Sequence, residues 1–63
     1  MYEQVELSER LQTLLAQEQR AEQEYGELAA ATEDVSLREQ IEQLRREKRR
    51  HVDLTQRLLE IVE

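Results

Sequence analysis

A seven-residue spacing of apolar side chains, repeated on both sides of a short polar segment, constrains the fold more than any other feature. Positions seven apart lie two turns apart on one face of a helix. In the first half, two adjacent columns hold Gln4, Leu11, Glu18, Tyr25 and Thr32, and Leu7, Leu14, Ala21 and Leu28, with Leu15 and Ala29 at their edge. This stripe predicts a helix from about Glu3 to about Ala31.

The second half of the chain repeats the spacing after Ser36. Its two columns hold Leu37, Leu44, His51 and Leu58, and Ile41, Lys48, Thr55 and Val62. They predict a second helix over about 37–62. Further apolar residues widen the stripe on both flanks in the last third of this helix, namely Val52, Leu54, Leu59 and Ile61. We therefore expect more than one helix to pack around that end.

The polar segment 32–36 is the predicted connection between the helices. Ser36 followed by Glu39 fits a capping box with Ser36 as N-cap, and Thr32 or Asp34 is an alternative cap. So short a connection makes the two helices antiparallel neighbours. The predicted fold is all-α, a single antiparallel two-helix hairpin that occupies residues 1–63.

The small size of the chain indicates that the hairpin needs a partner. A chain of 63 residues buries little apolar surface alone. It has no cysteine, which excludes disulfides and thiolate metal sites. It also has no proline, phenylalanine or tryptophan and one glycine, which argues against a β-rich fold. We expect two copies to pair into a four-helix bundle.

The charge pattern excludes other classes of partner. The net charge is -6 with both signs mixed along the chain, which disfavours nucleic acid. No apolar stretch approaches the roughly 20 residues that span a bilayer. Residues 1–10 are acidic and polar, so we expect no signal peptide and a cytoplasmic protein. The basic run at 45–50 is interpreted as a solvated face that pairs with glutamates of the first helix.

Four polar residues interrupt the apolar stripes: Glu18, Tyr25, Lys48 and His51. If the turn centres near residues 33–34, Glu18 lies level with the segment from Lys48 to His51. A carboxylate and an imidazole are good ligands for iron, manganese or zinc. Alternatively, the Lys48 ammonium pairs with Glu18, and His51 and Tyr25 are core side chains.

A pair of hairpins would bring two Glu18 and two His51 side chains together. Glu22 and Glu47 flank the stripes and could add oxygen ligands. Glu47 and His51 are four residues apart, so they can point the same way from one helix. No hydrolase constellation and no glycine-rich phosphate loop is present, so catalysis without a metal is not expected.

At these residues the chain resembles the ferritin-like superfamily, closest to the short two-helix encapsulated ferritins and rubrerythrin-like proteins. The first motif is Glu18-Gln-Arg-Ala-Glu-Gln-Glu-Tyr25, a metal-ligand Glu followed seven residues later by a Tyr. The second resembles the family's Glu-x-x-His and lies within Arg46-Glu47-Lys48-Arg49-Arg50-His51, where Lys48 takes the place of the Glu. The Ala31-Thr32 start of the loop also looks alike, and the resemblance covers about 17–60.

The resemblance implies a metal-binding bundle with Glu18 and His51 as ligands of iron or a similar divalent ion, supported by Tyr25. It further implies a ring-like oligomer, ferroxidase-like oxidoreductase activity at the subunit interface and an encapsulin-type shell as partner, although no targeting tail follows Glu63. Two alternatives remain open. One is a metal-free assembly hairpin whose site is filled by the Lys48–Glu18 pair, and the other is a coiled-coil adaptor for a heterologous helix.

Overall fold

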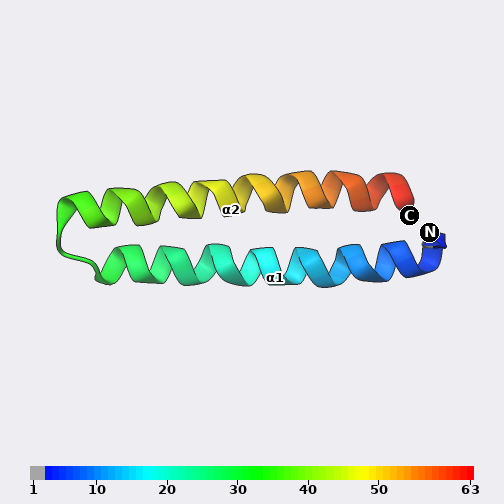
Figure 1. Ribbon diagram of the computed structural model, residues 1–63, viewed down its shortest axis with the longest axis horizontal. Helices are drawn as coiled ribbons and strands as arrows, with labels where there is room; N and C mark the ends of the chain where they lie inside the picture. Colours follow the sequence, from blue (N-terminus) through cyan, green and yellow to red (C-terminus); the bar gives the residue numbers. More distant parts are fainter. Residues whose placement is uncertain (1–2) are drawn as a thin grey trace.

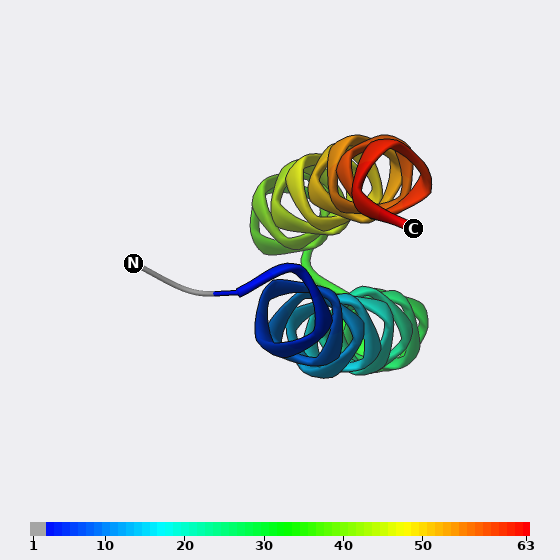
Figure 2. The ribbon, with the colours of Figure 1, turned by 90° about the vertical axis from the view of Figure 1, so that its right-hand side faces the viewer.

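The computed structural model describes residues 3–63 as two antiparallel α-helices joined by a short turn (Figure 1). Helix α1 spans Gln4–Ala31 and helix α2 spans Val35–Val62, each with 28 residues. The described part of the chain contains no strand. The predicted all-α hairpin is thereby confirmed. Seen end-on, the two helices form a single layer, so each has a helix neighbour on one side only (Figure 2).

The turn is built from Thr32 and Asp34, which have extended backbones at its two ends. The Thr32 N–H donates to the carbonyl of Ala29 at 3.1 Å and ends α1. The carboxylate of Asp34 accepts a hydrogen bond from the Leu37 N–H at 2.9 Å and begins α2. The N-cap is therefore Asp34, and the expectation that Ser36 caps this helix is wrong, because Ser36 already lies inside its first turn.

The seam between the helices follows a spacing of alternating three and four residues. Its buried hydrophobic side chains are Leu11, Ala29, Val52 and Leu59. Half-buried seam residues lie between them at the same spacing, namely Leu15, Glu18, Glu22 and Tyr25 on α1 and Ile41, Arg45, Lys48, Thr55 and Val62 on α2. This is the spacing by which two α-helices pack side by side.

The seam differs from the predicted columns in one respect. The column of Leu37, Leu44, His51 and Leu58 is exposed, whereas Val52 and Leu59, expected at its flank, are buried. On α1, Leu14 and Leu28 remain about half exposed, at 49% and 52%. A helix with one neighbour buries only the side that faces that neighbour. In this hairpin the buried side of each helix lies next to these exposed columns and does not include them.

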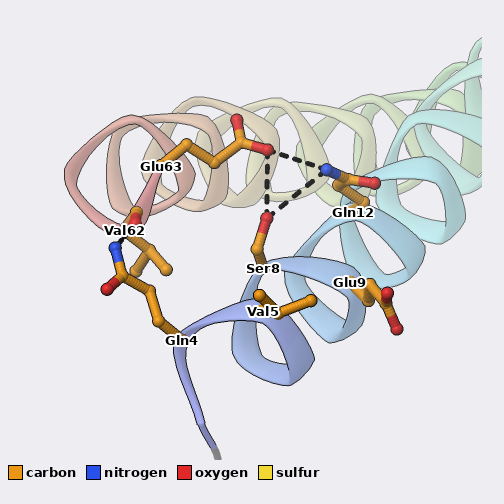
Figure 3. Close-up of a pocket in the computed structure, with 7 residues that line it drawn as sticks. All are labelled: Gln4, Val5, Ser8, Glu9, Gln12, Val62 and Glu63. Carbon is orange, nitrogen blue, oxygen red and sulfur yellow. Dashed lines mark hydrogen bonds between the residues drawn. The ribbon is translucent and has the colours of Figure 1, made fainter.

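Side chains of α1 hold the end of α2 at the open end of the hairpin (Figure 3). Ser8 Oγ and Gln12 Nε2 donate hydrogen bonds to the Glu63 carboxylate at 3.0 and 2.8 Å. Gln4 Nε2 donates to the carbonyl oxygen of Val62, a group that has no partner within its own helix. The open end is therefore tied by polar contacts that fix the register of the two helices.

The Asp34 cap gives a direct test of where α2 begins. We expect Asp34→Ala to lower the free energy of unfolding by about 1 kcal/mol, because the Leu37 N–H loses its acceptor. Ser36→Ala is the matched control and should change it by less than about 0.3 kcal/mol. Urea unfolding followed by circular dichroism at fixed protein concentration measures both, and a larger loss for Ser36→Ala would contradict the assignment.

Gly26 offers a second stability test. A Cβ built at this helical position would lie 3.2 Å from Arg45 Cδ, a contact that a shift of the flexible arginine side chain relieves. Glycine inside a helix costs about 1 kcal/mol relative to alanine. We expect Gly26→Ala to raise the free energy of unfolding by about 0.5 kcal/mol in the same assay. A loss instead would mean that the Arg45–Glu42 ion pair, at 2.7 Å, holds the arginine in place.

Candidate functional site

Three ionisable side chains from the two helices meet halfway along the hairpin. Glu18 Oε2 lies 3.2 Å from Lys48 Nζ and 3.5 Å from His51 Nδ1. Lys48 and His51 are one turn apart on α2, so both reach the single carboxylate that α1 presents. The structure thus brings together three of the side chains that the sequence placed at one height.

The carboxylate of Glu18 is the most enclosed member of this cluster. The side chains of Glu18 and Lys48 are 25% and 29% exposed, whereas that of His51 is 52% exposed. Glu18 Oε2 is itself buried and has no hydrogen-bond partner, so its contacts are charge contacts only. A buried carboxylate oxygen without a hydrogen bond is under-satisfied, and only the nearby ammonium compensates its charge.

The other predicted site residues do not join the cluster. Tyr25 is half-buried two turns nearer the loop. Glu22 lies in the seam, where its carboxylate is 3.8 Å from Arg49. Glu47 is exposed and lines a shallow hollow with Arg46 and Arg50. Neither carboxylate is therefore positioned to add oxygen ligands beside Glu18 in a single hairpin.

The cations in the basic run of α2 have ion-pair partners on both helices. Two of its cations bridge to α1, because Lys48 pairs with Glu18 and Arg49 with Glu22. Two further pairs stay within α2, where Arg45 contacts Glu42 at 2.7 Å and Arg49 contacts Asp53 at 3.7 Å. The predicted inter-helix ion pairs thus form at two positions, and Arg46 and Arg50 remain exposed.

A single hairpin brings only two candidate metal ligands together. Within residues 3–63, no group of three or more His, Cys, Asp or Glu side chains could hold one. Only Glu18 and His51 converge, and the Lys48 ammonium lies against the carboxylate that would bind. Zinc sites in proteins use three or four protein ligands, so a zinc ion here would require at least one further donor from another chain.

No helix among residues 3–63 is both long enough and apolar enough to cross a membrane. Comparison with protein-family models, curated proteins and solved structures finds no significant match to this chain.

Two features of the surface were not predicted from the sequence. One is the polar tie of Ser8, Gln12 and Glu63, whose only sequence signal is the four-residue spacing of Gln4, Ser8 and Gln12 on one face of α1. The other is that the column holding Leu44 and Leu58 is bare in the single hairpin. A heptad pattern reports which side of a helix is apolar and not which neighbour covers it.

A double-mutant cycle measures the central ion pair. We expect Glu18→Gln and Lys48→Met each to lower the free energy of unfolding by about 1 kcal/mol, because each leaves its partly enclosed partner unpaired. The double variant should lose less than the sum, with a coupling energy of about 0.5–1.5 kcal/mol. The exposed Arg49–Asp53 pair is the control, and its coupling should stay below about 0.3 kcal/mol. Equal coupling in both cycles would show that the central pair has no special role.

Proposed function

We propose that this chain is a self-associating helical hairpin, an assembly unit whose central polar position is filled by its own Lys48–Glu18 pair. The observation that carries this proposal is the position of Lys48 Nζ, 3.2 Å from the Glu18 carboxylate. An ammonium group here balances the charge that a bound cation would otherwise balance. In this function the pair fixes which helices lie together and in which register. An enclosed ion pair suits this role because it contributes to specificity while adding little net stability.

The degree of burial supports the need for further copies. In the described part of the chain, only four hydrophobic side chains are buried. Nine large hydrophobic side chains are at least 42% exposed, namely Val5, Leu14, Leu28, Val35, Leu37, Leu44, Leu54, Leu58 and Ile61. An exposed apolar surface on this scale marks an interaction site in a small protein. A four-helix bundle of two hairpins is the simplest arrangement that covers it.

A ferritin-like metal-binding protein is the second candidate, and one specific observation favours it. Glu18 Oε2 lacks a hydrogen bond, and the His51 ring lies 3.5 Å from it on the exposed side. Two copies could together supply two carboxylates and two imidazoles to iron or a similar divalent ion. The ring-like oligomer, the ferroxidase-type activity and the encapsulin-type shell belong to this second candidate.

Metal titration separates the two candidates. If Lys48 takes the place of a cation, Fe(II), Mn(II) and Zn(II) should leave the melting temperature of the wild type unchanged. Lys48→Glu should then gain metal binding and a melting temperature that rises with metal concentration, because ligand binding to the folded state stabilises it. Arg49→Glu introduces the same charge change beside the cluster and should gain nothing. Wild-type binding that Glu18→Gln abolishes would overturn the first candidate in favour of the second.

The stability of the chain should also depend on its concentration. For a hairpin that folds together with its partner, dilution lowers the melting temperature by mass action. We expect the melting temperature measured by circular dichroism to rise by several degrees between about 5 µM and about 500 µM protein. A concentration-independent melting curve, together with a monomer mass in sedimentation equilibrium, would favour the coiled-coil adaptor instead.

A further inference from the structure

The two broad faces of the hairpin have opposite character. On one face, polar side chains cross from helix to helix: Gln12 bonds to Glu63, and Arg49 approaches Glu22. We call this the polar face. It continues at seven-residue intervals through Gln19 on α1 and Gln56 on α2, both of which are exposed, and its ends carry the exposed side chains of Val5 and Val35. Between these ends, polar side chains line both helices on this side.

The opposite face carries the bare heptad columns. On α1 the flank away from Gln12 holds Leu14, Ala21 and Leu28 at seven-residue intervals, and on α2 the flank away from Glu63 holds Leu37, Leu44, His51 and Leu58. Because the polar flanks of the two helices meet on one side, these apolar flanks share the other. The contact of His51 with Glu18 agrees with this placement. We call this surface the apolar face. Its five leucines are each 42–56% exposed.

We propose that the apolar face binds the same face of a second copy, so that the two Glu18–Lys48–His51 clusters meet at the centre of the interface. This inference rests on the proposed function and names the surface through which association occurs. The position of the polar cluster points to a second copy of the chain as the partner. Glu18 is the fifteenth of the 28 residues of α1, and Lys48 is the fourteenth of the 28 residues of α2.

This central position makes a second copy the best-fitting partner. When two identical faces pair about a twofold axis through their middle, the middle of one hairpin meets the middle of the other. The polar level of each copy then lies against the polar level of its partner, and leucine levels lie against leucine levels on both sides. An unrelated helix would need the same length and a polar group at the same height to avoid burying the cluster against apolar side chains.

The charges of the hairpin agree with a protein partner rather than a lipid surface. The Glu18–Lys48 pair balances itself within one chain, so covering it leaves no uncompensated charge. Helices that lie on membranes carry basic polar faces. The whole chain instead has 15 acidic and 9 basic residues and a net charge of -6, which anionic lipid headgroups would repel. His51, 52% exposed in the single chain, is the polar side chain of the face that pairing would cover.

Sedimentation velocity on matched variants tests the surface. Leu14→Glu combined with Leu44→Glu places charge on the apolar face and should raise the dissociation constant of the dimer at least about 100-fold. Gln19→Glu combined with Gln56→Glu adds the same charge to the polar face and should change the dissociation constant by less than about 3-fold. The apolar face is not the interface if the two double variants weaken association equally. The same holds if the variant with Leu14→Glu and Leu44→Glu associates like the wild type.

If the variant that combines Leu14→Glu and Leu44→Glu fails to fold, His51→Leu tests the same surface. This change removes the half-exposed polar group from the centre of the proposed interface, and we expect the dissociation constant to fall about 10-fold. Weaker association of His51→Leu would overturn the inference. So would binding of monomeric wild type to phosphatidylcholine–phosphatidylglycerol vesicles.

The same experiments separate this inference from the proposed function. A wild type that stays monomeric at every concentration overturns both. A wild type that associates while all apolar-face variants associate equally well overturns only the choice of face.

Discussion

The structure depends on one constraint: each helix has a neighbour along one side only. A single layer of two helices gives its side chains one seam, and the other apolar positions stay in contact with water (Figure 2). Among residues 3–63, four buried hydrophobic side chains are few to offset the conformational entropy of two 28-residue helices. The turn, the Asp34 cap and the tie at the open end align the helices, but they add contacts at the ends rather than a core. In the proposed assembly, a second copy would supply the other half of the core.

The Glu18–Lys48 pair has a different role from the leucines. Its side chains are about three-quarters enclosed already, and one carboxylate oxygen lacks a hydrogen bond, so the pair adds little net stability. What the pair supplies is a preference for one register of the two helices over others. A slip of α1 against α2 by one turn would separate Glu18 from both Lys48 and His51 and break this three-residue cluster. The open-end contacts of Ser8 and Gln12 with Glu63 act in the same direction, because they too form in one register only.

The hairpin and the height of its polar cluster could be predicted from the sequence, because both follow from distances along the chain. Helices of equal length on either side of a short turn place Glu18 near Lys48 and His51 regardless of the details of the turn. The N-cap was harder, since Ser36 and Asp34 both have a side chain that can accept a hydrogen bond from a helix N-terminus. The buried side of α2 could not be predicted, because Val52 and Leu44 are equally apolar. Only the position of the neighbouring helix decides between them.

The exposed columns then gain a physical meaning. The side chains at Leu37, Leu44, His51 and Leu58 keep the seven-residue spacing of a packed stripe although nothing covers them in a single chain. A solvent-facing flank has no need of that spacing, and the opposite flank of the same helix is polar from Glu42 through Arg49 and Gln56 to Glu63, with Val35 at its start. The difference between the two flanks supports the proposed second seam. Lys48 balances Glu18 within the chain. In the proposed dimer the same ammonium charge would keep the shared centre neutral when another copy covers it.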